Sequence, residues 1–185
     1  MRTNRAGQSA LLLLDVIEIL RREKLDYLVI GAFALSAHAT VRASVDVDAL
    51  LYISYARLKR LSSIFESVGF VTTLRLGGAD DPIQGMLVLG DPHGNRVDLL
   101  GGLRGLDPKV FSRAIEVPFL NENLRIVGRE DLIAMNCFAA SPQDLTDARS
   151  AFQAARGPVD LDLLRTTTRR FGRDAADNLE EIIAR

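Results

Sequence analysis

The chain has 185 residues, of which 48% are hydrophobic and 25% charged, and it carries a formal net charge of -1 with a pI near 6.1. This length predicts one hydrophobic core, with a helical appendage at most. The near-neutral charge argues against a broadly basic protein that binds any nucleic acid. The single cysteine, Cys137, excludes an internal disulfide and a metal site built on several cysteines.

The apolar run Ala10–Leu14 near the N-terminus is too short to cross a membrane. Asp15 and Glu18 interrupt it, so it has the pattern neither of a membrane span nor of a secretory signal. We therefore expect a cytoplasmic protein that makes no membrane contact. The sequence leaves the oligomeric state open.

The first part of the chain alternates helices and strands. Apolar residues at helical spacing indicate helices, short apolar runs indicate strands, and glycines mark the breaks between them. They predict, in chain order, helix Ser9–Glu23, strand Tyr27–Ile30, helix Ala32–Ala39, strand Val45–Ile53, helix Tyr55–Val68 ended by Gly69, and strands Phe70–Leu74, Met86–Leu89 and Arg96–Leu100. The turn Asp91–Asn95 is short enough to make the last two strands an antiparallel hairpin.

The rest of the chain is mostly helical. It is predicted to contain minor strands Glu116–Leu120 and Leu124–Val127, then helices over 129–140, 143–155, 160–170 and 173–184, the second of them started by Ser141-Pro142. The predicted fold class is α/β (α+β), with a small mixed sheet flanked by helices. We expect residues 1–128 to form this core and residues 129–185 a helical region packed on it.

Two carboxylates stand at alternate positions in the predicted strand Val45–Ile53. Asp46 and Asp48 share one face of that strand, where like charges a few ångströms apart repel by about 1 to 4 kcal/mol. A cation relieves this repulsion, and Mg²⁺ (or Mn²⁺) prefers such oxygen ligands. If the strand that contains Asp98 lies alongside, three acids can hold two metal ions. The alternative is a solvated edge strand.

A glycine precedes the acidic pair by about fifteen residues. Gly31 ends one strand and opens a helix, where the backbone can approach a phosphate and the helix supplies free N–H groups. For an isolated glycine, an ordinary tight turn is the commoner explanation. The combination of Gly31 with Asp46, Asp48 and Asp98 is more specific than any one of these residues.

This combination resembles the nucleotidyltransferase superfamily with the DNA polymerase β-like fold, whose signature is a glycine turn, an Asp-hydrophobic-Asp pair and a third acid. The string Arg42-Ala43-Ser44-Val45-Asp46-Val47-Asp48 is similar to that of AbiEii-like and minimal nucleotidyltransferases of toxin–antitoxin and phage-defence loci. Segments 130–135 and 144–147 are similar to the helical part that follows their catalytic core.

The resemblance implies transfer of a nucleoside monophosphate from an NTP to a hydroxyl of a tRNA, a partner protein or a small molecule. It implies the following roles: Asp46, Asp48 and Asp98 as catalytic residues and metal ligands, Gly31 and Ala32 as the cradle of the triphosphate, and Arg42 and Ser44 as contacts to phosphate oxygens. Asp98 would also help to deprotonate the attacking hydroxyl.

Two positions depart from the family pattern. Ala32 stands where Gly or Ser is usual, and Asn136 stands where related proteins often have lysine. These departures favour an alternative, a catalytically silent nucleotide-binding or regulatory module. A weaker third hypothesis is a metal-dependent phosphohydrolase that uses the same acids.

Other polar residues have plainer explanations. His38 is a candidate for nucleotide contact, although a packing role fits it at least as well, and His93 fits a hairpin tip. Acids lie close to the four C-terminal arginines, which favours a solvated helix face over an RNA-binding surface; these arginines are Arg165, Arg169, Arg170 and Arg173.

Overall fold

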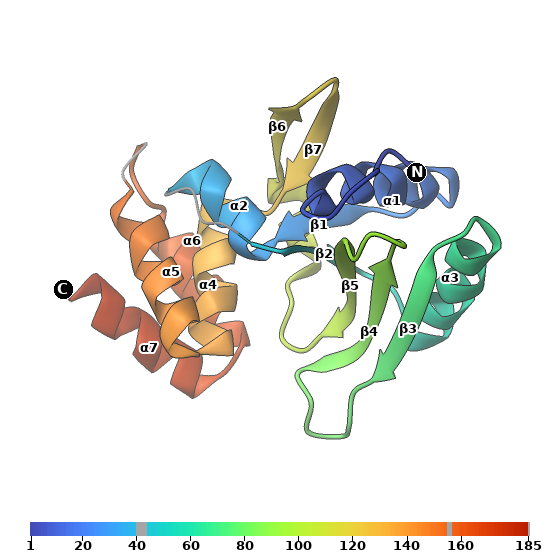
Figure 1. Ribbon diagram of the computed structural model, residues 1–185. Coiled ribbons are helices and arrows are strands. Elements are labelled where there is room, and N and C mark those ends of the chain that lie inside the picture. The colour runs from blue at the N-terminus through green and yellow to red at the C-terminus, as the bar shows by residue number, and fades with distance from the viewer. Residues whose placement is uncertain (40–43, 155–156, 185) are drawn as a thin grey trace. The chain divides into compact units, whose positions relative to one another are not determined.

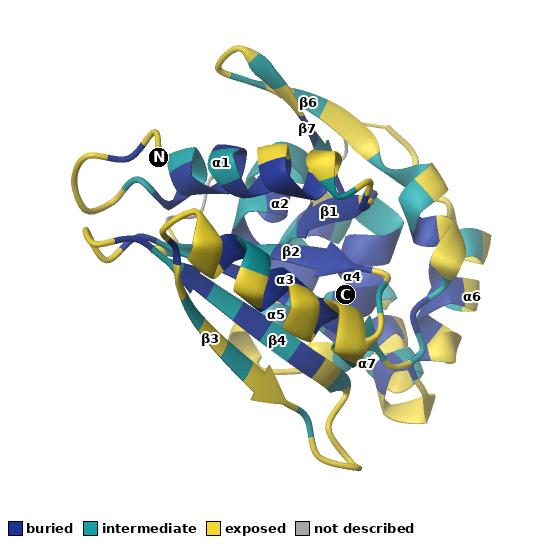
Figure 2. Ribbon diagram, turned by 90° about the vertical axis from the view of Figure 1, so that its right-hand side faces the viewer, coloured by how far each residue is buried: buried dark blue, intermediate teal, exposed yellow. Residues whose placement is uncertain are grey.

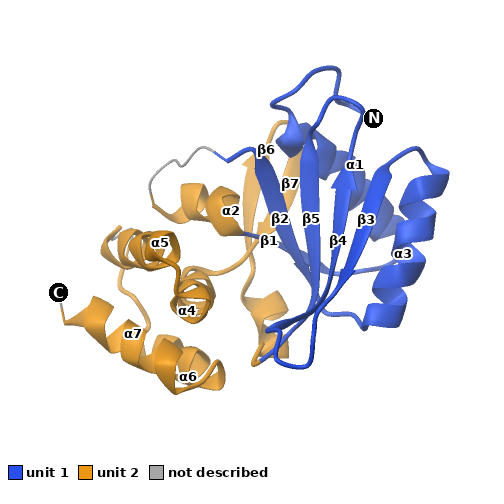
Figure 3. Cartoon of the chain, turned by 60° about the horizontal axis from the view of Figure 1, so that its bottom comes forward, with its two compact units in different colours: residues 1–30, 43–104 blue, residues 31–42, 105–185 orange. Residues whose placement is uncertain are grey.

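A computed structural model describes residues 1–39, 44–154 and 157–184 (Figure 1). The chain divides into two compact units, residues 1–30 with 43–104 and residues 31–42 with 105–185 (Figure 3). Unit 1 contains α1 (Ser9–Arg22), β1 (Tyr27–Ile30), β2 (Asp46–Leu51), α3 (Tyr55–Ser67), β3 (Val71–Leu76), β4 (Ile83–Gly90) and β5 (Arg96–Leu103). Unit 2 contains α2 (Gly31–His38), the 3-10 helix η1 (Pro108–Arg113), β6 (Ile115–Phe119), β7 (Glu122–Ile126), α4 (Arg129–Ala139), α5 (Pro142–Gln153), α6 (Leu161–Arg170) and α7 (Arg173–Ile183).

The strands of unit 1 lie side by side in the order β3-β4-β5-β2-β1. Only β2 and β5 are parallel, and the other neighbours are antiparallel, so the predicted mixed sheet is confirmed. β4 and β5 form the predicted antiparallel hairpin. The crossover from β2 to β5 passes through α3, β3 and β4, which brings two strands that are far apart in the sequence into direct contact.

Both helices of unit 1 pack on one face of this sheet (Figure 3). α1 contacts β2 and β5, and α3 contacts β3, β4 and β5. The residues of α3 that face the strands are buried, whereas its outer side is exposed (Figure 2). The strand residues beneath the helices form the core of the unit, namely Val47, Ala49, Leu51, Leu87, Leu89, Val97 and Leu99, each at most 5% exposed. Because side chains alternate along a strand, the residues between them belong to the other face.

A network around the β4–β5 turn fixes the start of β5. The Asp91 carboxylate accepts hydrogen bonds from the backbone N–H of His93 (2.8 Å) and from the backbone and side chain of Asn95 (2.9 and 2.7 Å). The Asn95 side chain also donates to the Arg5 carbonyl oxygen (2.8 Å) and accepts from the Gln8 N–H (2.6 Å). This one turn therefore holds the N-terminal segment against the strand that contains Asp98.

In unit 2, α4 is the central helix and contacts α2, α5, α6 and α7. Its N-terminal turn is fixed by Arg113, whose guanidinium donates to both oxygens of the buried Asp131 (2.7 Å each) and to Asp107 (3.0 Å). These acids raise the pKa of Arg113, so its charge is permanent. The predicted start of α5 is confirmed, since Ser141 caps it in a capping box with Asp144, and Pro142 follows.

Most predicted elements are present, with shifted ends. β4 begins at Ile83 and β5 extends to Leu103, both beyond the predicted ranges, and η1 lies between β5 and β6, where no helix or strand is predicted. Gly69 follows the end of α3 with φ 93°, the left-handed conformation expected for a glycine in this position. Within the described part of the chain, no helix combines the length and the apolar character needed to cross a membrane.

The Asp91 turn gives a prediction for stability against pH. Burial raises the pKa of Asp91, but hydrogen bonds led by that from the Asn95 side chain outweigh this effect and lower it to about 2, from an ordinary value of 3.8. The stabilisation is therefore complete above about pH 4 and is lost as the pH falls through 2. Asp91→Asn should unfold more easily than wild type by about 2 kcal/mol at pH 7.

Urea denaturation of both proteins between pH 2.5 and 7 measures this difference. The gap in unfolding free energy should shrink as the pH falls below about 4. A gap that stays constant over this range would contradict the assignment, and no gap at pH 7 would show that the turn contributes nothing.

Candidate active site

The three predicted acids lie on neighbouring strands of unit 1 and share the sheet face opposite α1 and α3. In the parallel register of β2 and β5, Asp46 pairs with Arg96 and Asp48 pairs with Asp98. Paired residues on adjacent strands point to the same side of a sheet. We call this side the aspartate face; at its acidic end it contains Asp46, Asp48, Arg96 and Asp98. The sequence alone had left open whether β5 would lie beside β2.

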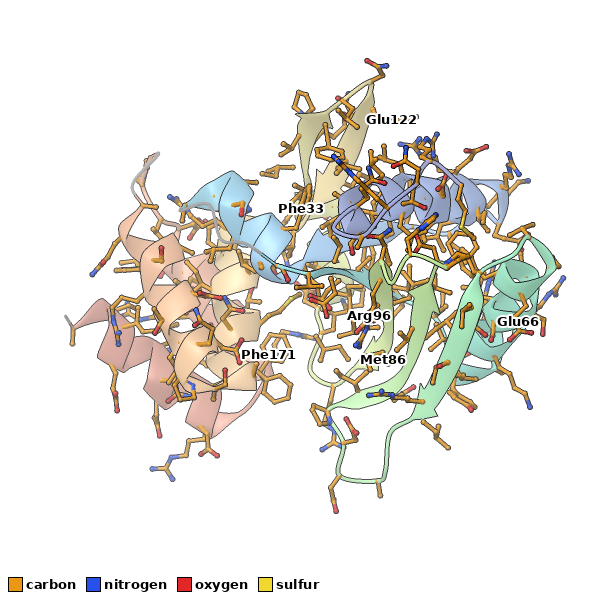
Figure 4. All side chains as sticks on the ribbon, viewed as in Figure 1. Phe33, Glu66, Met86, Arg96, Glu122 and Phe171 are labelled. Carbon is orange, nitrogen blue, oxygen red and sulfur yellow. The ribbon has the colours of Figure 1, made fainter. Side chains whose placement is uncertain are left out.

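Arg96 interacts with all three acids of this charged group. Its guanidinium forks onto Asp98, with Nε donating to Oδ1 (2.7 Å) and Nη2 donating to Oδ2 (2.5 Å). The Asp98 side chain is 6% exposed and that of Arg96 38% exposed, so the acid is buried beneath its partner. Hydrogen bonding to Asp98 raises the pKa of Arg96, and the charges of Asp46 and Asp48 raise it further. Figure 4 labels Arg96 on β5.

Two serines hold the backbone and side chains near the acids. The Ser9 hydroxyl donates to the Val45 carbonyl oxygen (2.5 Å) and accepts from the Arg96 N–H (3.0 Å), so α1 joins the starts of β2 and β5. The exposed Ser44 donates its hydroxyl proton to Asp46 Oδ1 (3.0 Å). That proton must be redirected before Ser44 can contact a phosphate oxygen, which is the role that the sequence predicted for it.

The predicted phosphate cradle belongs to unit 2. α2 begins at Gly31, which directly follows the last residue of β1 and has φ 65°, a conformation that glycine adopts without strain. Ala32 is buried, at 6% exposure. Arg42, the other predicted phosphate contact, lies outside the residues that the structure describes. The roles of Gly31, Ala32, Arg42 and Ser44 stay predictions.

Solved structures with similar folds exist, although neither a protein-family model nor a curated protein sequence matches the chain. The solution structure of the antibiotic-resistance factor ANT(2'')-Ia is 15% identical, with a TM-score of 0.61 over 96% of this chain and 97% of that one. Its complex with adenylyl-2''-tobramycin is 14% identical, with a TM-score of 0.59 over 90% and 97%. The lincosamide antibiotic adenylyltransferase LnuA, with lincomycin bound, is 10% identical, with a TM-score of 0.52 over 83% and 100%.

The chain has a nucleotidyltransferase fold. The likeness spans nearly all of these proteins, and it agrees with the fold that the motif residues implied. At such low identity it shows the architecture alone. The narrower AbiEii-like resemblance rests on the motif residues.

In this nucleotidyltransferase fold, Asp46 and Asp48 are suitable ligands for a magnesium ion. Mg²⁺ commonly binds one or two carboxylates and completes its shell with water and substrate phosphates, and the two acids stand on one strand face. Asp98 differs, because both of its oxygens already accept from Arg96. Among the described residues, no three His, Cys, Asp or Glu side chains are grouped so that they could hold a metal ion. The geometry fits a two-carboxylate site better than a three-carboxylate one.

Arg96 is the residue that sequence reasoning missed. Arg96 stands two residues before Asp98 on a strand, so the two side chains must share one face. The spacing Arg-x-Asp on a predicted strand was the available signal. Arg96 therefore supplies part of the positive charge that the sequence predicted beside the three acids.

The remaining candidates from the sequence lie in unit 2 and have structural partners. His38 Nε2 is 2.7 Å from the Val127 carbonyl oxygen, and burial lowers the pKa of His38, so the neutral ring donates this hydrogen bond. Arg165 pairs with Glu180 on exposed helix surfaces, as expected for a solvated face.

Unit 1 also contains a cavity of about 470 Å³ away from the three aspartates. It is lined mostly by α3 residues, which include Arg57 and Arg60, and none of the three aspartates lines it.

The Arg96–Asp98 pair gives a prediction for stability. Arg96→Met leaves the buried Asp98 carboxylate without its partner and should cost about 2 kcal/mol of unfolding free energy at pH 7. Adding Asp98→Asn removes the unpaired charge and should restore most of the loss. Urea denaturation of the two single variants, the double variant and wild type measures the coupling; strictly additive effects would contradict it.

Proposed function

We propose that the protein transfers a nucleoside monophosphate from an NTP to a hydroxyl group of a small-molecule acceptor and releases pyrophosphate. The observation that carries this proposal is the register of β2 and β5, which assembles Asp46, Asp48 and Asp98 on one face of a nucleotidyltransferase fold. The acceptor class follows the solved neighbours, whose structures contain lincomycin and an adenylylated tobramycin. We place the reaction in the cytoplasm, where NTPs and magnesium are available.

In the proposed reaction, the acceptor oxygen forms a bond to the α-phosphorus of the NTP. The bond from that phosphorus to the bridging oxygen breaks, pyrophosphate leaves, and the hydroxyl proton passes to Asp98. Asp46 and Asp48 would hold Mg²⁺ (or Mn²⁺), which neutralises phosphate charge when bound. The protein contributes mainly positioning and electrostatic stabilisation.

The fork of Arg96 is compatible with a proton-accepting Asp98. Each carboxylate oxygen has two lone pairs, so an oxygen that accepts from Arg96 can still accept a hydrogen bond from a hydroxyl. The fork fixes the orientation of the carboxylate, and Ser9 fixes the backbone of Arg96. We infer that Arg96 positions Asp98.

Asp46→Asn tests the proposed function. The variant should lose about a thousandfold in rate, because a charged metal ligand is replaced by a neutral amide. The assay incubates the full chain with magnesium, α-labelled NTPs and a cell extract, and measures label in the small-molecule, RNA and protein fractions. Asp80→Asn is the matched control, since Asp80 is an exposed acid in the β3–β4 connection.

Label that depends on Asp46 and appears in small molecules supports the proposal. Label in the RNA or protein fraction would replace the proposed acceptor with a tRNA or a partner protein, as the AbiEii-like resemblance suggests. Release of phosphate without labelling would favour hydrolysis. Equal labelling by wild type and Asp46→Asn would refute the assignment of this site.

A second candidate function is a catalytically silent module that binds NTP. The specific observation in its favour is that Arg96 already donates hydrogen bonds to both oxygens of Asp98. The departures of Ala32 and Asn136 from the family pattern also favour a protein without catalytic activity. Calorimetry with magnesium and each NTP separates the two readings. Tight binding without turnover favours the module, whereas turnover rules it out.

A further inference from the structure

The aspartate face continues beyond Asp98 onto β4 and β3. In the antiparallel registers, Val88 pairs with Asp98 and Met86 pairs with Leu100. β3 adds the next row, where Thr73 pairs with Val88 and Arg75 with Met86. We call this surface the β3–β4 platform; it consists of Val71, Thr73, Arg75, Met86, Val88 and Leu100. Figure 4 labels Met86 on β4 beside the strand that contains Arg96.

The platform is accessible and mostly apolar. Val71 is 63% exposed, Thr73 and Arg75 are also exposed, and Met86, Val88 and Leu100 are partly exposed. α1 and α3 pack on the opposite face of this sheet. An apolar surface of this kind gains free energy when a ligand removes it from water.

The charge of the platform has one sign. Neither β3 nor β4 contains an Asp or Glu, and the only charged side chain on the platform is that of Arg75. The single acid next to it, Asp98, is paired with Arg96. A ligand with several ammonium groups would therefore meet Arg75 and apolar side chains on β3 and β4, which carry no carboxylate.

The proposed function places the acceptor over this platform. If Asp98 accepts the hydroxyl proton, the acceptor must contact Asp98, while Asp46 and Asp48 on β2 hold the nucleotide side. The neighbour of β5 on its other edge is β4. The body of the acceptor then covers β4 and β3.

We propose that the acceptor is a hydroxyl compound that has an apolar part and carries no cationic groups, bound on the β3–β4 platform. This inference rests on the proposed function and adds a substrate class to it. It separates this chain from ANT(2'')-Ia, whose complex contains adenylyl-2''-tobramycin. Met86, Val88 and Leu100 contact the apolar part, and Arg75 disfavours cations by charge repulsion.

Methionine methyl signals provide a direct test. The chain has three methionines, of which Met1 lies beside Val68 and Phe70, just before the start of β3, and Met135 is buried in α4. The full chain is labelled at its methionine methyl carbons and titrated, with magnesium present, with octyl glucoside below its micelle concentration, with tobramycin and with fully N-acetylated tobramycin. Met86→Leu identifies the platform signal.

Octyl glucoside and N-acetylated tobramycin should shift the Met86 signal at concentrations about tenfold lower than tobramycin. Arg75→Glu should reduce this difference to about threefold or less, because it replaces repulsion with attraction. Arg60→Glu is the matched control, since Arg60 is an exposed arginine on the outer side of α3, and it should leave the preference unchanged.

The outcomes separate this inference from the proposed function. A Met86 shift at lower concentration with tobramycin than with its acetylated form would overturn the inference, as would no shift with any probe. Asp46-dependent labelling would still support the function in either case. A selective shift without Asp46-dependent labelling supports the binding surface and refutes the catalytic role.

Discussion

The structure depends on placing three carboxylates on two paired strands while keeping their mutual repulsion in check. The parallel register of β2 and β5 aligns Asp48 with Asp98 and Asp46 with Arg96. Without a cation, such a group of acids would destabilise the sheet that contains it. The fork of Arg96 onto Asp98 removes part of this penalty. In the function that we propose, charge balance and metal binding are thus divided between neighbouring strands.

The supports of this site lie far from it in the sequence. Asn95 connects the β4–β5 turn to the N-terminal segment, and Ser9 connects α1 to the starts of β2 and β5. Each of these polar groups satisfies backbone atoms that would otherwise be unpaired near the edge of the sheet. These hydrogen bonds tie the start of the strand that contains Asp98 to α1 and to the N-terminal segment. The side toward β3 contains apolar residues and one arginine and no acid. This difference in charge between the two sides is the basis for the acceptor class that we infer.

Local patterns predicted much of the fold. Alternation identified the faces of β2, glycine marked the end of α3, and Ser141-Pro142 marked the start of α5. Patterns of this kind depend on residues close together in the chain. The register of β2 against β5 depends on a crossover through α3, β3 and β4, so the partnership of Asp48 with Asp98 was only a conditional expectation. The role of Arg96 follows from the strand face that it shares with Asp98, where its guanidinium forks onto the carboxylate. The roles of Gly31, Ala32, Arg42 and Ser44 rest on family resemblance.

The central claim is that Asp46 and Asp48 form a divalent-cation site that an NTP completes. Electron paramagnetic resonance of Mn²⁺ measures this directly, because free Mn²⁺ gives a strong signal that decreases on binding. The account predicts that ATP and wild-type protein together bind Mn²⁺ more tightly than either does alone, and that Asp46→Asn with Asp48→Asn abolishes this gain. Equal binding by the wild type and the double variant would contradict it.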